Sequence, residues 1–553
     1  MSTITNPIIP GMAPDPSILR VDNDYYIATS TFHWQPAIQI FHSTDLVNWQ
    51  LIDYALKDTD LNLQGTNTPA GIWAPHLSYD TESKKFWLAY CHVQNMAGRE
   101  FNAESYAICS DSITGPWSKP LYLTSIGFDP SLFHDENGKH YIAVLEWETR
   151  EGYQAPGHIV ISEVDLTNGK IKGWHRVTTG FTSRGCVEAP QIYKHNGYYY
   201  LLLASGGTGY AHGVELGRAK QIFGPYEANP THEPIITSSP HHLFSLGDPD
   251  AGHFEMYNPN STIQKSGHGS LVKTSDNKWY IAHLMSRPLA GTKLNPLGRE
   301  TGLQQMHWTD DGWLEMADGS NFAKQTVQVS NTDVQQDAHI FDIDDHFNNG
   351  QYDKRFMTPY HKQDQSWVKV VNGKLSISGR NSFFSQVSPS IMGTRATSLN
   401  YYVQTKLEFH PTHYSETAGL GLYYDANNWF YVRLCQANNE KGLVLRALQA
   451  KLGQRIDFMF DEVRVPNNTA EIRINYHNGI ATVNYRFTDC KWTQLGHQFD
   501  LSYLSDEGVN GEPGEIGGFT GLFNFIGAVD AYEHQSHGDF EYYQVKTEIL
   551  RKD

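Results

Sequence analysis

The sequence predicts an all-β protein with two domains, a five-bladed β-propeller followed by a C-terminal β-sandwich. Aromatic residues make up 13% of the chain and glycine occupies 47 positions, a composition typical of short strands joined by tight turns. A diverged motif recurs five times before residue 320, and repeats of this length are typical of propeller blades. Beyond residue 340 the sequence instead alternates between polar and apolar residues.

Each copy of the repeat joins a short motif to an aromatic strand. The motifs begin at Asp15, Ala74, Asp129, Ala189 and His268. A polar turn and a strand follow each motif, as in Asp24–Ile27 and Gly197–Tyr200. Because this order of elements recurs at a similar phase, we expect residues 1–320 to form five blades around one axis. An irregular β-sandwich with chance similarities is the alternative.

The second domain follows a change in composition. The change comes after Met316, and residues 321–339 are predicted to form a polar linker. Residues 340–553 contain stretches such as 401–405 and 481–485, in which the side chains alternate in polarity. Antiparallel strands with one buried face have this pattern, so a β-sandwich is predicted.

Charge and hydropathy narrow the choice of partners. The formal charge is −18, which argues against nucleic acid as a partner because a polyanion would be repelled. The chain has no run of about 18 apolar residues, so no membrane partner is expected. Residues 1–17 contain neither the basic region nor the apolar core of a secretion signal, and we expect a cytoplasmic location. Monomer and homo-oligomer both remain open.

Three acidic residues accompany the repeat: Asp15, Asp129 and Glu188. Residues near the beginning of the innermost strand of a blade face the axis, so we expect these three carboxyls to converge. Crowded carboxylates repel one another, and at least one should therefore stay protonated near neutral pH. Glycosidic cleavage requires one protonated acid and one ionised carboxylate. Turn capping or solvation would explain any one of the three alone, but three at one repeat phase favour a catalytic site.

The acidic motifs resemble those of a known enzyme family. The segments Pro14–Ser17, Gly127–Ser131 and Val187–Gln191 resemble the three acidic motifs of glycoside hydrolase family 43. The opening segment Asn6–Gly11 is similar to the β-xylosidase branch of that family, and the resemblance extends over nearly the whole chain. It implies the same propeller and sandwich. It also implies an exo-acting, inverting β-D-xylosidase that cleaves xylobiose and short xylo-oligosaccharides from the non-reducing end.

The resemblance further implies a role for each acid. Asp15 would be the general base and Glu188 the general acid. Asp129 would raise the pKa of the acid and hold it in place. The residues by themselves predict the trio but not this division of roles.

Other matched positions of the propeller imply a pocket for one sugar. Arg299 resembles the arginine that holds sugar hydroxyls beside the acids, and a structural ion pair is the alternative. Phe32, Trp73 and Trp147 resemble the aromatic walls of the sugar site. Burial in a blade core explains each of these aromatic residues equally well when it is taken alone.

One segment of the second domain is also expected at the pocket. The stretch Gly517–Phe523 resembles a loop that lends one aromatic side chain to the rim, with Phe519 and Phe523 as the candidates. Such a wall would leave room for one terminal sugar and would favour exo-action. The connection from Arg287 to Leu297 is short beside those of several relatives, which leaves the shape of the leaving-group side open.

A metal is expected, if anywhere, near His268. The resemblance places this residue where the family has an axial histidine, close to the sugar or to the shell of a structural calcium ion, and a purely structural histidine is the alternative. Neither an HExxH motif nor a CxxC motif among the five cysteines predicts a metal site. We therefore expect that catalysis requires no cofactor, with calcium near His268 as the one metal candidate.

Three other functions compete with this interpretation. An α-L-arabinofuranosidase is the nearest, as main or side activity, because the family mixes both activities and the two sugars present similarly spaced hydroxyls. A non-catalytic carbohydrate-binding protein would use the acids only to hydrogen-bond sugars, but three intact acidic motifs argue against it. A retaining fructosyl or sucrose-cleaving propeller enzyme ranks third, because the segment around Asp15 lacks its usual nucleophile motif.

Overall fold

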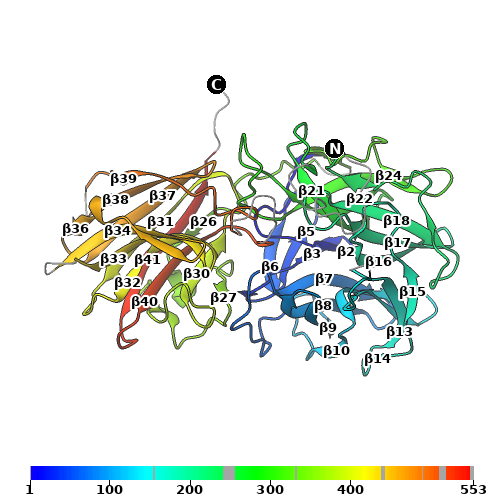
Figure 1. Cartoon of the computed structure of the whole chain (residues 1–553), viewed down its shortest axis with the longest axis horizontal. Helices are drawn as coiled ribbons and strands as arrows, with labels where there is room; N and C mark the ends of the chain where they lie inside the picture. Colours follow the sequence, from blue (N-terminus) through cyan, green and yellow to red (C-terminus); the bar gives the residue numbers. More distant parts are fainter. Residues whose placement is uncertain are drawn as a thin grey trace.

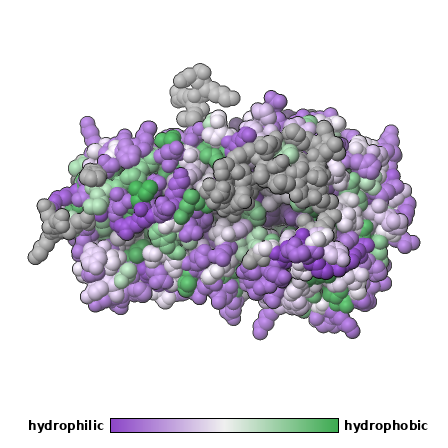
Figure 2. Space-filling view, viewed as in Figure 1, coloured by the Kyte–Doolittle hydropathy of each residue, from purple (hydrophilic) through white to green (hydrophobic). Residues whose placement is uncertain are grey.

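The chain folds into two β domains that lie side by side (Figure 1). This computed structural model describes residues 2–153, 156–240, 256–330, 333–437, 442–487, 490–509 and 518–548. Within these ranges there is no α-helix, and two single-turn 3-10 helices occupy Asn348–Gly350 and Met459–Asp461. No helix of the described part is long and apolar enough to cross a membrane. The face in Figure 2 is mostly hydrophilic, with hydrophobic residues scattered over both domains.

The N-terminal domain is a propeller of five antiparallel sheets, as predicted. Blade 1 contains β2 (Ser17–Val21), β3 (Asp24–Thr29), β5 (Gln39–Ser43) and β6 (Gln50–Tyr54). Blade 2 contains β7 (Gly71–Asp80), β8 (Lys85–Ala97), β9 (Glu100–Ser110) and β10 (Leu121–Thr124). Blade 3 contains β11 (Gly127–His134), β12 (His140–Glu146), β13 (Ile159–Asp165), β14 (Lys170–Ile171) and β15 (His175–Thr178).

The last two blades complete the ring. Blade 4 contains β16 (Glu188–His195), β17 (Tyr198–Ser205), β18 (Gly213–Ala219), β19 (Glu227–Ala228) and β20 (Ile236–Thr237). Blade 5 contains β21 (Gln264–Lys273), β22 (Trp279–Ser286), β23 (Glu300–Trp308) and β24 (Leu314–Met316). The first strands contact one another in the order β2, β7, β11, β16 and β21, and β21 contacts β2 again. The beginnings of these strands therefore surround one axis.

The aromatic and apolar strands of the repeat fill the spaces between blades. In β12, the residues from Tyr141 to Leu145 are all buried, and in β17 the same holds from Tyr200 to Ser205. A central strand that is covered on both faces of its sheet has a continuous run of apolar residues instead of alternating polar and apolar residues. The blades thus pack face to face through their second strands.

The two ends of the propeller sequence close the ring. Strand β1 (Ser2–Thr5) pairs with β25 (Thr326–Val329), with Ser2 opposite Val329. The side-chain amide of Asn6 donates to the carbonyl oxygens of Leu303 and Lys324, both at 2.9 Å. The segment predicted as a linker, residues 321–339, thus contains a strand of the propeller closure.

The C-terminal domain is a sandwich of two antiparallel sheets. One sheet has the order β28 (Val368–Val371), β29 (Lys374–Ser378), β41 (His537–Thr547), β31 (Asn400–Phe409), β37 (Thr469–His477), β38 (Ile480–Arg486) and β39 (Thr493–Asp500), with β26 (Ile343–Asp345) beside β41. The other has the order β30 (Ser390–Arg395), β40 (Phe523–Asp530), β32 (Glu416–Asp425), β33 (Asn428–Gln436), β34 (Leu443–Lys451) and β35 (Gln454–Asp457), with β36 (Val463–Val465) beside β34. In β38, buried and partly exposed residues alternate from Ala481 to Asn484, as predicted, and β37 beside it alternates along its whole length. Strand β32 is instead buried at every residue.

The two domains share one hydrophobic core at their junction. Strand β4 (Trp34–Gln35) of the propeller pairs with β27 (Thr358–Pro359) of the second domain. The Trp34 ring stacks on Phe523 with 3.6 Å between the ring centroids and 10° between the planes. Both side chains are fully buried, so the junction excludes water and fixes the sandwich against the propeller.

A second contact between the domains lies beside the axis. The backbone N–H of Leu522 donates to the carbonyl oxygen of Pro296 at 2.8 Å. Gly298 has a φ of +67°, and a Cβ atom there would lie 1.8 Å from the carbonyl oxygen of Thr520. Only glycine allows the two backbones to approach this closely. The segment after residue 518 is thereby held against the beginning of β23.

Candidate active site

Three acidic residues stand at the beginning of the innermost strands. Asp15 precedes β2, Asp129 lies near the start of β11, and Glu188 is the first residue of β16. These strands belong to blades 1, 3 and 4, and β11 contacts β16 directly. The structure therefore brings the three predicted carboxyls to one end of the propeller axis.

The repeat gives the same backbone conformation at one position of each blade, and Glu188 does not occupy that position as the sequence had predicted. Five non-glycine residues at equivalent positions have a left-handed backbone: Asp15, Ala74, Asp129, Ala189 and His268, with φ between 39° and 57°. In blade 4 the left-handed residue is Ala189, so Glu188 lies one residue before the position that Asp15 and Asp129 occupy in their blades. Glu188 and Phe128 each precede a β-bulge, which adds one residue to the innermost strand. The left-handed residue and the bulge turn Glu188 toward the axis although its repeat position differs.

Burial and mutual repulsion raise the pKa of two of these carboxyls. Burial, and then the negative charge of Asp15, raise the pKa of Glu188 to about 7, against the opposing effect of Arg299. Burial, Glu188 and Asp15 raise the pKa of Asp129 well above its ordinary value. The backbone N–H of Ala189 donates to Asp129 Oδ2 at 3.1 Å, which favours the ionised form of Asp129. Near neutral pH the pair of Glu188 and Asp129 therefore holds at least one proton.

Asp15 is held by Ser30 of its own blade and lies beside His268 of blade 5. The Ser30 hydroxyl donates to Asp15 Oδ2 at 2.6 Å and accepts a hydrogen bond from the backbone N–H of Ala74 at 2.6 Å. His268 Nδ1 lies 3.4 Å from Asp15 Oδ1. Asp15 keeps 13% of its side chain exposed, so the carboxylate is oriented and stays partly open to solvent. Sequence reasoning did not identify Ser30, because a serine within a blade carries no distinctive pattern.

Arg299 faces the acids with unused hydrogen-bond donors. It immediately precedes β23, its side chain is 3% exposed, and its charge acts on both Glu188 and His268. The guanidinium atoms Nε and Nη2 are buried and have no hydrogen-bond partner. A buried guanidinium usually satisfies its donors, so an oxygen-rich ligand is the expected partner.

The predicted aromatic walls form one connected group around Trp73. The centroid of the Trp73 ring lies 6.2 Å from that of Phe32, 5.5 Å from Phe128 and 6.4 Å from Phe519. Trp147 continues this group, with its ring centroid 5.8 Å from that of Phe128. Phe128 was not among the residues selected from the sequence.

The two candidates in the second domain have different surroundings. The Phe519 ring is partly exposed and lies under Arg299, with 3.9 Å between the guanidinium carbon and the ring centroid. Phe523 is fully buried against Trp34 in the junction between the domains, away from the acids. The structure thus brings Phe519 to the site and does not bring Phe523 there. Gly517, the first residue of the predicted loop, lies outside the described residues.

A buried ionic cluster links the second domain to Arg299. Asp506 Oδ2 lies 3.8 Å from Arg299 Nε and 3.4 Å from Lys265 Nζ, and Lys265 Nζ also donates to Glu507 Oε1 at 2.5 Å. The side chains of Lys265, Asp506 and Glu507 have no exposed surface. The hydroxyl of Tyr424 donates to Asp506. Arg299 is therefore positioned from both sides of the domain junction, which no local sequence pattern predicted.

His268 lies beside Asp15 rather than in a group of metal ligands. Burial lowers the pKa of His268, although Asp15 raises it in part. Among the described residues, the group of acidic, histidine and cysteine side chains close enough to share a metal ion consists of Asp80, His134 and His140. Calcium near His268 stays a prediction.

Comparison with known families matches both domains. The family model "Glycosyl hydrolases family 43" matches residues 4–314. The model "Beta xylosidase C-terminal Concanavalin A-like domain" matches residues 344–546. The two matches leave the segment between them at residues 315–343.

Full-length relatives share both domains in the same order. The chain is 34% identical to xylosidase/arabinosidase 43B of Humicola insolens, over 98% of this chain and 97% of the relative. It is also 34% identical to a xylan 1,3-beta-xylosidase of a Vibrio species, over 98% of this chain and 99% of that one. The crystal structure of a xylan beta-1,4-xylosidase from Bacillus halodurans C-125 superposes with a TM-score of 0.89 at 34% identity, covering 98% of this chain and all of the other.

Proposed function

Because the chain belongs to glycosyl hydrolase family 43, we propose that it is an exo-acting, inverting β-D-xylosidase. Its substrates would be xylobiose and short xylo-oligosaccharides, attacked at the non-reducing end. The observation that carries the proposal is the proton-holding pair of Glu188 and Asp129 next to Asp15, close to Arg299, whose Nε and Nη2 atoms have no hydrogen-bond partner. Relatives of both halves of the chain carry β-xylosidase names, which supports the choice of sugar.

The proposed mechanism divides two proton transfers between two carboxyls. Glu188, with a pKa of about 7, gives its proton to the glycosidic oxygen as the bond to the leaving sugar breaks. Asp15, held by Ser30, takes a proton from a water molecule as that water attacks the anomeric carbon from the opposite face. Direct attack by water inverts the configuration at that carbon. Asp129 would help to keep Glu188 protonated by repulsion, because the charge of Glu188 raises the pKa of Asp129 and this repulsion acts in both directions.

The walls of the pocket favour removal of one terminal sugar. Trp73 would offer apolar ring surface to a pyranose, with the buried Phe32 ring packed behind it, and Arg299 would offer donors to the sugar hydroxyls. Phe519 comes from the other domain and covers Arg299. A pocket closed in this way by a second domain accommodates the end of a chain and excludes its middle.

The test of the proposal is hydrolysis of xylobiose followed by NMR of the anomeric protons. We expect α-xylose as the first product, with the β anomer appearing only through mutarotation. Asp15→Asn and Glu188→Gln should each reduce kcat at least about 10³-fold while the far-UV circular dichroism stays unchanged. Initial release of β-xylose would refute inversion. Ordinary activity of a folded Asp15→Asn variant would refute the assignment of the base.

An α-L-arabinofuranosidase is the second candidate, because the relative from Humicola insolens is named a xylosidase/arabinosidase. Relative values of kcat/KM on nitrophenyl β-D-xylopyranoside and nitrophenyl α-L-arabinofuranoside separate the two functions. We expect the xyloside to be the better substrate. Since the named relatives include 1,3- and 1,4-xylosidases, xylobioses of both linkages belong in the same assay.

A further inference from the structure

Three potential metal ligands lie at the end of the propeller opposite the carboxyls. Asp80 and His134 are the last residues of β7 and β11, and His140 is the first residue of β12. Asp129 stands near the other end of β11, five residues before His134. At a rise of about 3.3 Å per residue, the group lies roughly 15 Å from the catalytic carboxyls.

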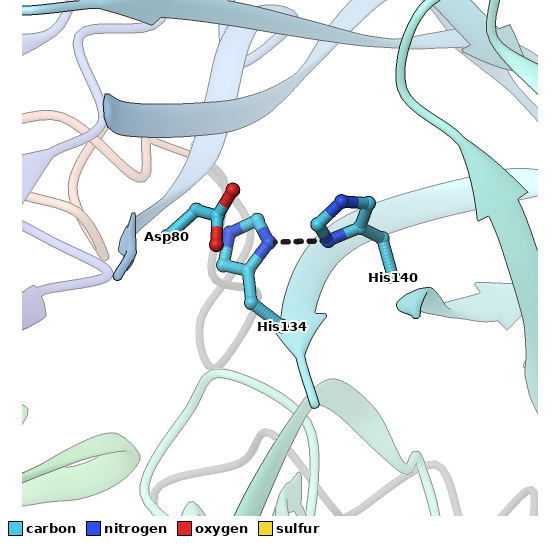
Figure 3. Close-up of side chains that lie close together, drawn as sticks. All are labelled: Asp80, His134 and His140. Atoms are coloured by element: carbon cyan, nitrogen blue, oxygen red, sulfur yellow. Dashed lines mark hydrogen bonds between the residues drawn. The ribbon is translucent and has the colours of Figure 1, made fainter. Parts of the chain in front are cut away.

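The two histidines face each other across a β-hairpin. His134 and His140 are direct partners in the pairing of β11 with β12, and their Nδ1 atoms lie 2.9 Å apart. Figure 3 shows the two rings pointing toward each other, with the Asp80 carboxylate beside the His134 ring. One ligand atom from each of the three residues lies within 4.8 Å of the other two. Ligands of a tetrahedral zinc ion stand about 3.4 Å apart, so small side-chain rotations would bring all three to one ion.

Neighbouring groups already orient two of the three ligands. The Ser78 hydroxyl and His134 Nε2 are 3.0 Å apart. If Nε2 carries the proton and donates it to Ser78, the lone pair of His134 lies on Nδ1 and faces His140. Asp80 accepts hydrogen bonds from the backbone N–H groups of Glu82 and Ser83, at 3.2 and 3.3 Å. Such outer contacts fix the orientation of histidine and carboxylate ligands in metal sites.

The space between His134 Nδ1 and His140 Nδ1 is where a cation would bind. Two neutral imidazoles at this distance share one proton, donated by His140 when His134 Nε2 is protonated. A divalent ion would take the place of that proton: His140 would carry its proton on Nε2 instead, both Nδ1 lone pairs would bind the ion, and the Asp80 carboxylate would balance part of its charge. Asp80 is buried, whereas both histidines are partly exposed, so the open side of the group faces solvent.

We propose that Asp80, His134 and His140 bind one divalent transition-metal ion of the zinc type, with water in the remaining position. Two imidazoles and one carboxylate suit zinc, whereas calcium prefers a shell of oxygen ligands. The ligands come from blades 2 and 3, so a bound ion ties together two neighbouring blades. The site is independent of the sugar pocket and of the reaction proposed there.

The test is isothermal titration of the EDTA-treated, full-length protein with zinc chloride. We expect one ion per chain with a Kd in the micromolar range or below. His140→Ala and Asp80→Asn should each weaken binding at least tenfold, and zinc should raise the Tm of the unaltered protein but not that of His140→Ala. His195→Ala is the matched control, because His195 ends β16 in blade 4 as His134 ends β11 and is not a member of the group.

Several outcomes would overturn this proposal. The first is a titration of the unaltered protein that shows no saturable heat. The second is unchanged zinc affinity in His140→Ala, or in His140→Gln if the alanine variant does not fold by circular dichroism. The third is binding that survives His140→Ala and is lost in Glu188→Gln, which would place the ion in the catalytic pocket. All three readouts measure ion binding, so a failure of the proposed xylosidase activity would leave them unaffected.

Discussion

Glu188 and Asp129 are carboxyls that lie in the field of a third, Asp15, with Asp129 buried and Glu188 half-buried. Desolvation and a neighbouring negative charge each disfavour the ionised form of a carboxyl. Here the two effects act together and raise the pKa of both Glu188 and Asp129. We therefore expect the pH dependence of activity to follow from these three side chains.

The pH profile of kcat/KM on xylobiose should lose its alkaline side as the acid gives up its proton. Because the pKa of Glu188 is raised to about 7, activity should fall as the pH rises through about 7. Asp129→Asn removes a carboxyl that repels Glu188 when both are ionised, and it should therefore shift this decline to lower pH. A substrate whose leaving group needs no protonation, such as a dinitrophenyl xyloside, should show a weaker decline. An unchanged alkaline limb in Asp129→Asn would contradict the role assigned to Asp129.

The same carboxyl should cost stability at alkaline pH. The folded protein raises the pKa of Glu188 from 4.5 to about 7, so folding favours the protonated form. The associated stability is complete below about pH 4.5 and is lost as the pH rises through about 7. Glu188→Gln cannot ionise, and its Tm should exceed that of the unaltered protein by about 1–3 °C at pH 8. At pH 4.5 the two Tm values should agree. A difference of equal size at both pH values would show that packing rather than charge is responsible.

The sequence predicts the three acidic residues but not the side chains that hold Asp15 and Arg299 in place. Asp15, Asp129 and Glu188 were found because a repeated motif marks their place near the axis. Ser30 and Asp506 were not found, since their roles depend on contacts between segments far apart in the chain. Even for Glu188 the repeat phase was off by one residue, because a β-bulge and a left-handed Ala189 change which side chain points inward.

The segment Gly518–Phe523 and the following strand β40 show how one element serves two purposes. Phe519 stands under Arg299 at the pocket, and Phe523, four residues later, stacks on Trp34 in the junction core. Sequence reasoning placed this segment near the rim but left the choice between the two aromatic residues open. The choice depends on where the backbone enters β40, which is set by the close approach of Gly298 to Thr520.

Replacing the two phenylalanines separately should give opposite phenotypes. Phe519→Ala should lower kcat/KM on xylobiose at least tenfold with little change in Tm, since it removes a wall that contacts Arg299. Phe523→Ala should reduce the free energy of unfolding by about 3–5 kcal/mol, because the ring is fully buried against Trp34. Kinetics at a temperature where both variants are folded separates the effects. Full efficiency of Phe519→Ala would remove the second domain from the pocket.

The ionic cluster should position Arg299 through Asp506. Asp506→Asn weakens the hold on the guanidinium and should lower kcat about tenfold or more with a smaller change in KM. Glu507→Gln is the matched control. It also breaks a buried contact with Lys265, but within the described part of the chain the ion pair with Arg299 comes from Asp506 and not from Glu507. Equal losses of kcat in both variants would show that the cluster acts only through stability.

At the scale of the whole molecule, the two domains form one functional unit. The β4–β27 pair and the stack of Trp34 on Phe523 give them a common core, and Phe519 of the second domain lies against Arg299 of the propeller. The order of domains and their strand types followed from repeats and alternation. Their docking did not, because it depends on surface shape that no single-sequence periodicity records.

Removing residues 340–553 should abolish activity. The truncated propeller would lose the wall formed by Phe519 and would expose Trp34 to water. Expression of residues 1–339 with an assay on xylobiose measures the loss, and circular dichroism shows whether the propeller is still folded. Adding the second domain as a separate chain should restore part of the activity if both pieces fold. Full activity of the isolated propeller would contradict this view of the domain.

The place of the last two strands has a consequence for how the molecule is made. Strands β40 and β41 follow the other strands of the sandwich in the sequence, yet each lies inside its sheet, β40 between β30 and β32 and β41 between β29 and β31 (Figure 1). During synthesis, Asp15, Asp129 and Glu188 have therefore all been made long before either sheet of the sandwich can be completed. One sheet waits for β40 and the other for β41, so a premature stop within β41 would leave a chain with all three acids but without a central strand of its second domain.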